Sequence, residues 1–248
     1  MFNYIKGEIY RILHKKSMYI YYGIFAVLYF IIVFVFSKKV YTTESIINDA
    51  ENYFTFLPVI VGGYFFAALY TDDLSSKNLT TLVGYGLSKL KIVLSKFLLM
   101  TFFSAVIIGL IPVLMAGIYA IFGVSPTAAV MGEIYIYALT ALMKTVAFAA
   151  LSGIVVYGIQ RNTFAIVLYV ALAFGIVSQL VSLLLNTAIV KGIAPGLDKY
   201  LMSGITIRLQ VSLLLNEPDL WIFAEYAIYA AIALALSTLA FRKKELEF

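Results

Sequence analysis

Two charged residues stand inside otherwise uncharged apolar runs, and they are the first side chains in this sequence that could do chemistry. Lys144 lies within the run over 134–158, and Glu225 lies near the start of the run over 220–241. A charge at the centre of a bilayer costs roughly 2.5–3.5 kcal/mol on insertion scales, so such a residue faces protein or water and marks function by default. We interpret both as candidates for a translocation path. The alternatives are snorkelling for either residue, or a structural ion pair for Lys144.

The sequence lacks the motifs that would make the chain an ATPase, a hydrolase or a metalloenzyme. Its one histidine, His14, has no metal-ligating neighbours, and it has no cysteine for a disulfide or a thiolate site. It contains no phosphate-binding G-x-x-x-x-G-K-[ST] loop and no G-x-S-x-G nucleophile motif. We therefore expect no enzymatic activity, no cofactor and no metal in this chain.

The elements that must position these residues are long apolar helices. Of 248 residues, 63% are hydrophobic and 12% charged, and the mean hydropathy is +0.98, whereas a soluble domain has about 25% charged residues. The runs do not alternate as barrel strands do, and each can cross a hydrocarbon core of about 30 Å. We predict an all-α membrane protein, a single domain over 1–248, with six transmembrane helices over 18–36, 52–70, 97–123, 134–158, 163–190 and 220–241.

The distribution of lysine and arginine predicts the orientation of these spans. Six spans place both termini on one side, and 12 of the 18 basic residues fall on that side, against 5 on the other, where Lys38 and Lys39 are discordant. Short basic loops stay in the cytoplasm. We expect a multi-pass protein of the cell membrane with cytoplasmic termini, and we attribute the net charge of +5 to topology and not to nucleic acid.

Residues 1–17 precede the first span and have the pattern of an interfacial helix. Ile5 and Ile9 recur at helical spacing, while Arg11 and Lys15 fall on the remaining face. Such a helix lies in the membrane surface, with its basic side chains at anionic headgroups. The alternative is a simple extension of the first span.

A second amphipathic segment, 71–96, joins the second and third spans. Asp72 and Asp73 suit a helix start, Gly84 and Gly86 predict a turn, and Ser88 can cap the helix that follows. Between them we expect a short helix over about 73–83, and we expect Lys89, Lys91 and Lys96 at the headgroups. The segment is too long and too patterned for a mere connection, although a solvated loop is the alternative.

Three further features concern packing and the other side of the membrane. Gly62 and Gly63 follow Pro58, and the run over 152–158 contains two glycines, so both places favour close helix approach. The segment near 191–219 is long and apolar. We expect short helices there, at the outer membrane surface.

This order of parts resembles the ABC-2 class of ABC-exporter permeases. The stretches that carry the resemblance are KGEIYRILHKKSMYI at 6–20, DDLSSKNLTTLVGYGLSKLKIVLSKFL at 72–98 and FRKKELEF at 241–248. Where family members commonly have a glycine after the acidic pair, this chain has Ser76, Lys77 and Asn78, which leaves the start of the short helix open.

The resemblance implies a permease subunit whose motor is another chain. The short helix would be a coupling helix seated in a separate ATPase subunit, which would hold ATP and magnesium, and the N-terminal helix would flank the same contact. A second permease subunit, identical or paralogous, would complete the exporter in the lipid bilayer. The implied ATPase contacts are Asp72, Asp73, Ser75, Ser76, Leu79, Leu82 and Val83, flanked by Ile5, Ile9, Arg11 and Lys15.

The cargo implied is amphipathic or hydrophobic. The sequence looks most like Gram-positive bacterial permeases for toxic peptides, of the phenol-soluble-modulin or bacteriocin-immunity type, and its 19 phenylalanines and 19 tyrosines would suit such a path. Aromatic belts at the membrane surfaces are the alternative explanation. Two other functions remain open: an ion-coupled secondary transporter or channel centred on Lys144, and a non-catalytic membrane scaffold.

Overall fold

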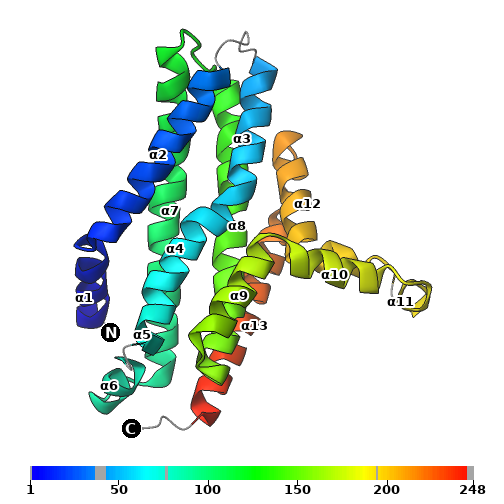
Figure 1. Ribbon diagram of the computed structural model, residues 1–248. Coiled ribbons are helices and arrows are strands. Elements are labelled where there is room, and N and C mark those ends of the chain that lie inside the picture. Colours follow the sequence, from blue (N-terminus) through cyan, green and yellow to red (C-terminus); the bar gives the residue numbers. More distant parts are fainter. Residues whose placement is uncertain (1, 37–42, 76–77, 194, 245–248) are drawn as a thin grey trace.

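The computed structural model describes residues 2–36, 43–75, 78–193 and 195–244, and these are folded as helices joined by short links (Figure 1). No strand occurs in this part of the chain. The helices are α1 Phe2–Leu13, α2 Lys16–Phe36, α3 Thr43–Leu57, α4 Gly63–Phe66, α5 Asp72–Ser75, α6 Asn78–Gly84, α7 Lys89–Ile121, α8 Ala128–Ile159, α9 Asn162–Ala173, α10 Ile176–Leu185, α11 Ala188–Ile193, α12 Met202–Leu214 and α13 Leu220–Lys243.

Four helical segments within the described residues are long and apolar enough to cross a membrane, so the chain is an all-helical, membrane-embedded protein. They overlap the second, third, fourth and sixth runs of the sequence. A shorter apolar stretch, Lys16–Ile31, lies within α2. The four segments are Ser45–Leu74, Lys89–Ile121, Ala128–Ile159 and Leu220–Lys243.

The prediction of one continuous helix over 163–190 is wrong. The chain bends by 67° between α9 and α10, because Gly175 adopts the left-handed conformation, with φ of 75°, which ends one helix and lets another begin in a new direction. A second break follows α10 at Asn186. As Figure 1 shows, α10 and α11 therefore project sideways from the bundle.

The helix of the second apolar run continues without interruption from Thr43 to Ser75. It passes through two π-helical turns, Pro58–Gly62 and Ala67–Thr71, and Asp72 has ordinary helical dihedrals. The expectation that Asp72 and Asp73 start a helix is therefore wrong, since they end a long one. Their carboxylates pair with cations on other elements.

The centre of the bundle is α8, against which α3, α7, α9, α12 and α13 pack. Glycines set the closest approaches. A Cβ built on Gly62 would lie 1.8 Å from the Tyr169 hydroxyl, and one on Gly153 would lie 3.1 Å from Ser237 Oγ on α13. The expectation of close packing at these two places is confirmed, although Gly63 has open space beside it.

One end of the bundle gathers α1, α5, α6, the start of α7 and the end of α13 (Figure 1), and we call it the base. The predicted separation of the N-terminal helix from the first span is present, since α1 ends at Leu13 and α2 begins at Lys16. The short helices expected near 191–219 are also present, as α11, a 3-10 turn at Leu197–Tyr200, and α12.

Candidate functional site

Six charged side chains meet at the base, five from three helices and Lys15 from the link after α1. They form what we call the charge cluster: Glu8, Arg11, Lys15, Asp72, Asp73 and Lys96. The cluster joins α1 to α5 and to α7. Three carboxylates face three cations, so the formal charges balance.

Lys96 is the centre of the charge cluster. Its Nζ lies 2.9 Å from Glu8 Oε2 and also pairs with Asp73 Oδ2, and it sits 5.5 Å from the centre of the Tyr4 ring. Lys96 is 1% exposed, Asp73 2% and Glu8 5%. Buried charges of this kind persist only when they are paired, so these three residues hold the base together as one unit.

Arg11 and Lys15 form the outer side of the charge cluster. Arg11 Nη2 donates to Glu8 Oε2 at 2.7 Å and to the Ala68 carbonyl at 3.0 Å. It also lies 3.6 Å from Asp73 Oδ1, and Lys15 pairs with Asp72. Both cations therefore bind protein carboxylates at the end of the second helical run, and not only lipid headgroups as the sequence suggested.

Protonation of Glu8 reflects this environment. Burial on its own would raise the pKa of the Glu8 carboxyl, but the nearby positive charge of Lys96 and the hydrogen bond from Arg11 outweigh it, so the pKa is lowered below its ordinary value of 4.5. Burial also opposes the charge of Arg11, but its hydrogen bond to Glu8 and the surrounding carboxylates raise the pKa of the guanidinium. Both shifts favour the charged forms of Glu8 and Arg11 at neutral pH.

The helix α1 reaches this position by packing against α7. Ile12 is fully buried, and Ile5 and Ile9 are partly buried against the core. These apolar residues share a helix face with Glu8, because positions three and four apart are neighbours on a helix. That face is directed at protein, whereas the sequence suggested contact with lipid.

The short helix α6 lies at the base, next to the charge cluster, and Asn78 at its start donates to Asp73 Oδ1 at 3.3 Å. Leu79 is buried, and Leu82 and Val83 pack against the core. Their predicted contact with a partner stays a prediction, but the free surface of α6 lies elsewhere. It includes Thr81 and, directly after the helix, Tyr85, whose side chain is 83% exposed.

The turn after α6 follows the sequence prediction. Gly86 has φ of 81°, a left-handed conformation that ends a helix at little steric cost, and its N–H donates to the Val83 carbonyl at 2.9 Å. Ser88 then caps α7 by accepting from the Lys91 N–H, so both predictions are confirmed. The turn holds Tyr85 outward at the tip of the base.

Of the other predicted residues in this segment, Ser75 ends α5 and Ser76 lies outside the described residues. Lys89 does not face headgroups alone: its Nζ donates to the carbonyls of Phe241 and Lys244, each at 2.9 Å. Cations stabilise the C-terminal ends of helices, where carbonyl groups lack partners. Lys89 thus ties the end of α13 to the start of α7.

Sequence reasoning missed Glu8 and Lys96 as the centre of the site, since it placed Lys96 at the headgroups. The structure shows Lys96 buried within a charge cluster. The available signal was the one acidic residue, Glu8, on an otherwise basic and apolar helix. An isolated charge of this kind on an apolar face needs a partner.

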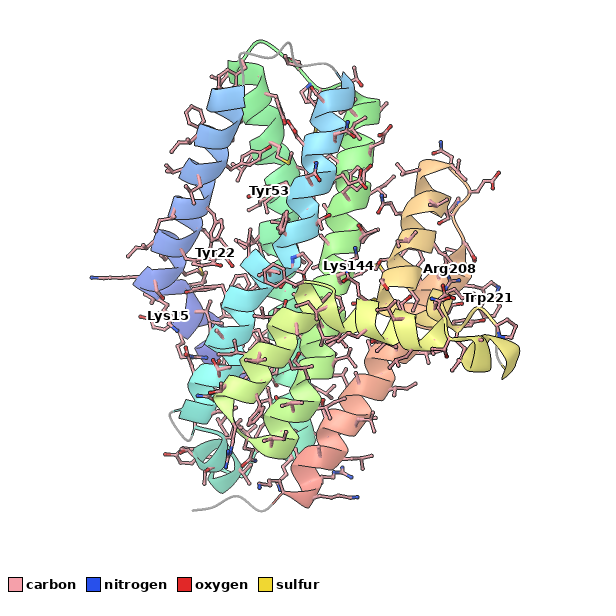
Figure 2. The ribbon with its side chains drawn as sticks, turned by 45° about the vertical axis from the view of Figure 1, so that its right-hand side comes forward. Lys15, Tyr22, Tyr53, Lys144, Arg208 and Trp221 are labelled. Carbon is pink, nitrogen blue, oxygen red and sulfur yellow. The ribbon has the colours of Figure 1, made fainter. Side chains whose placement is uncertain are left out.

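Lys144 and Glu225, the two charges within the apolar runs, lie outside the charge cluster and have different neighbours. Glu225 on α13 pairs with Arg208 on α12, whose Nη2 also donates to the Lys199 carbonyl at 3.1 Å. Lys144 on α8 instead borders an open cleft of about 590 Å³ and has no ion-pair or hydrogen-bond partner within the described part of the chain. Figure 2 shows Lys144 beside the point where α10 leaves the bundle.

A second hollow, of about 180 Å³, is apolar. It lies between α2, α3 and α7, and Figure 2 shows two of its lining residues, Tyr22 and Tyr53. An aromatic pair contributes to the contact between α2 and α3, since the ring centres of Tyr29 and Tyr53 are 4.5 Å apart. Part of the high aromatic content thus fills this contact.

Among the residues that the structure describes, no group of three His, Asp or Glu side chains could hold a metal ion. The fold and the base together define a class: an all-helical membrane protein in which buried ion pairs join the helices at one end. Comparison with protein-family models, with curated proteins and with solved structures finds no match to this chain.

Proposed function

We propose that this chain is the transmembrane permease subunit of an ATP-driven exporter of the ABC-2 class, with six spans and with its base in the cytoplasm. The observation that carries the proposal is the charge cluster, which fixes α1, α5 and α7 together next to the exposed tip of a short helix. Hydrolysis of ATP, with its magnesium, takes place in a separate P-loop ATPase subunit.

A coupling element has to transmit force, and the base supports this role. A short helix on a flexible loop would move without moving the spans. Here Asn78 contacts Asp73, which pairs with Lys96 at the start of α7. A push on α6 is therefore passed to the second and third spans, and through Glu8 to α1.

The contact surface proposed for the ATPase differs from the one implied by the resemblance. Tyr85 and Thr81 are exposed, whereas Leu79 is buried. Large aromatic side chains dominate the binding free energy at many protein interfaces. Tyr85 is therefore the proposed anchor, and Leu79 supports it from beneath.

The cargo proposed is an amphipathic or hydrophobic molecule such as a toxic peptide, handled by two permease subunits, identical or paralogous. The apolar hollow between α2, α3 and α7 supports this class of cargo. Its lining offers contacts for aliphatic and aromatic groups and lies within the predicted spans.

Co-purification tests the proposal. The chain is purified from its own cells, and the yield of co-purified P-loop ATPase and its hydrolysis rate are compared for the wild type, Tyr85→Ala and Ile121→Ala. Ile121 is the control because it is also exposed, at 71%, but lies at the end of α7 that is far from the base. We expect Tyr85→Ala to lower recovery and hydrolysis about tenfold or more, with Ile121→Ala near wild type.

Equal recovery with both variants, or no association with any P-loop ATPase, would count against the proposal. Transport that depends on Lys144 and proceeds without ATP would favour the ion-coupled transporter or channel. Loss of a membrane partner on deletion, with no nucleotide-linked change, would favour the scaffold.

A further inference from the structure

The cleft beside Lys144 combines a charge, polar groups and apolar surface, and it lies apart from the base. It lies between α3, α8, α10 and α12 and is open, with a volume of about 590 Å³. Its polar lining consists of Thr55, Lys144, Ser178, Gln179, Ser182 and Ser203.

Helix α10, which follows the bend at Gly175, has its polar side toward this cleft. Ser178, Gln179 and Ser182 lie on one face by helical spacing and line the cleft. The opposite face of α10 carries apolar side chains such as Leu180 and Leu184, which are 57% and 66% exposed. A polar face held inside an apolar environment is stable only against water, protein or a polar ligand.

Lys144 supplies an uncompensated positive charge. It lies within α8, one of the four segments able to span a membrane, and no carboxylate is within ion-pair distance of it in the described chain. The charge of Glu51 on α3 acts on Lys144 through space without pairing with it. By contrast, Arg208 on α12 pairs with Glu225.

The start of α10 adds positive partial charge beside Lys144. Gly175, at the bend, lines the cleft, and the first backbone N–H groups of a helix have no acceptor within that helix. Broken helices of this kind place their positive N-terminal ends at anionic groups within membranes. Apolar residues complete the lining, among them Phe148, Leu172 and Phe174.

We infer that this cleft is a binding site for the anionic head of an amphipathic molecule, with Lys144 pairing a carboxylate or phosphate oxygen and the apolar lining receiving the start of its hydrocarbon body. Hydroxyl and amide groups of Ser178 and Gln179, which have no hydrogen-bond partner in the described chain, would complete the contacts to the head. This binding site does not depend on the proposed function.

A direct binding titration tests the site without an ATPase. The purified chain is placed in discs of phosphatidylcholine, and a long-chain fatty acid bearing a dansyl group is titrated against its methyl ester. We expect the acid to bind about ten- to hundredfold more tightly than the ester, as a charge-assisted hydrogen bond implies. Lys144→Met should reduce binding of the acid to the level of the ester, and Lys144→Arg should retain it.

Two further variants protect the test against misfolding of Lys144→Met. Gln179→Leu removes a polar group from α10 and should narrow the difference between acid and ester. Lys91→Met, at an exposed lysine near the base, should leave it unchanged. Equal affinity for acid and ester in the wild type, or an undiminished preference for the acid in Lys144→Met or Gln179→Leu, would overturn the inference.

The source of the anion is decided by competition in the same titration. Phosphatidylglycerol mixed into the discs displaces the probe if the site takes a lipid phosphate. A fatty acid that displaces the probe where phosphatidylglycerol does not assigns the site to free carboxylate amphiphiles. Either result supports the anion site, and failure of both to compete contradicts it.

Discussion

At the scale of single residues, the chain concentrates its buried charge in one place. Lys96, Glu8 and Asp73 come from three different elements and are each at most 5% exposed. Ion pairs in such surroundings contribute little net stability compared with apolar packing, but they are costly to break. The charge cluster therefore specifies how α1, α5 and α7 fit together more than it stabilises the bundle.

Replacing Lys96 tests this account of the base. Lys96→Met removes one of the two cations that Glu8 and Asp73 share, so that Arg11 alone faces both buried carboxylates. We expect a loss of about 3–5 kcal/mol in the free energy of unfolding. Lys91→Met on the same helix, at an exposed position, should change it by no more than about 0.5 kcal/mol. The measurement is denaturation in mixed detergent micelles followed by circular dichroism, and equal behaviour of the two variants would contradict a buried charge cluster.

Glu8 predicts a dependence on pH with a definite sign. Its pKa is lowered in the folded chain below the ordinary 4.5. Its contribution to stability is therefore complete above that value and is lost as the pH falls through the folded pKa. Thermal unfolding midpoints measured from neutral pH down to acid pH should fall more steeply for the wild type than for Glu8→Gln below about pH 4.5. Parallel curves would show that Glu8 is not paired.

At the scale of elements, glycines decide how closely the helices approach. Gly62 ends the π-helical turn that begins at Pro58, and the Tyr169 hydroxyl donates to the Pro58 carbonyl at 2.7 Å. The missing side chain of Gly62 makes room for that hydroxyl. The contact links the second helical run to α9.

Gly62→Ala and its neighbour Gly63→Ala form a matched pair. The new methyl at residue 62 would displace the buried Tyr169 and break its hydrogen bond, so we expect a loss of about 1–3 kcal/mol. At residue 63 nothing lies within 4 Å of the added Cβ, and alanine is favoured over glycine within helices by up to about 1 kcal/mol. Thermal unfolding of both variants should move in opposite directions, and a similar shift in both would contradict the packing described.

The elements also show what could be predicted from the sequence. Helices α7, α8 and α13 follow from apolar runs that contain at most one charge each, because crossing a bilayer requires long apolar runs. The bend at Gly175 does not follow, since a glycine in an apolar run is also compatible with an unbroken span. The polar residues Ser178, Gln179 and Ser182, spaced on one helix face, were the signal that α10 differs from its neighbours.

The candidate site was predicted only in part, because local sequence pattern shows the side of the membrane on which a residue lies but not its partner. Local pattern placed Arg11, Lys15, Asp72 and Asp73 on one side of the membrane. It did not pair them, because Glu8 and Lys96 are 88 positions apart in the chain and only the tertiary fold brings them together.

At the scale of the whole molecule, two separate regions have the two proposed roles, contact with a motor and binding of an anion. The base, with its charge cluster and the exposed Tyr85, is the proposed contact with a motor. The cleft at Lys144, away from the base, is the inferred anion site. An exporter needs both a coupling surface and a place for an amphipathic ligand, and the helices α7 and α8 run through the bundle between them (Figure 1).

Cross-linking from Tyr85 tests the central claim most directly. The chain has no cysteine, so Tyr85→Cys and Ile121→Cys each carry one reactive thiol, the first in the turn before α7 and the second at the end of α7. With a short thiol–amine cross-linker in membranes, we expect a product joining Tyr85→Cys to a P-loop ATPase, and none from Ile121→Cys. Absence of that product from Tyr85→Cys, with the thiol shown to be reactive, would contradict the account.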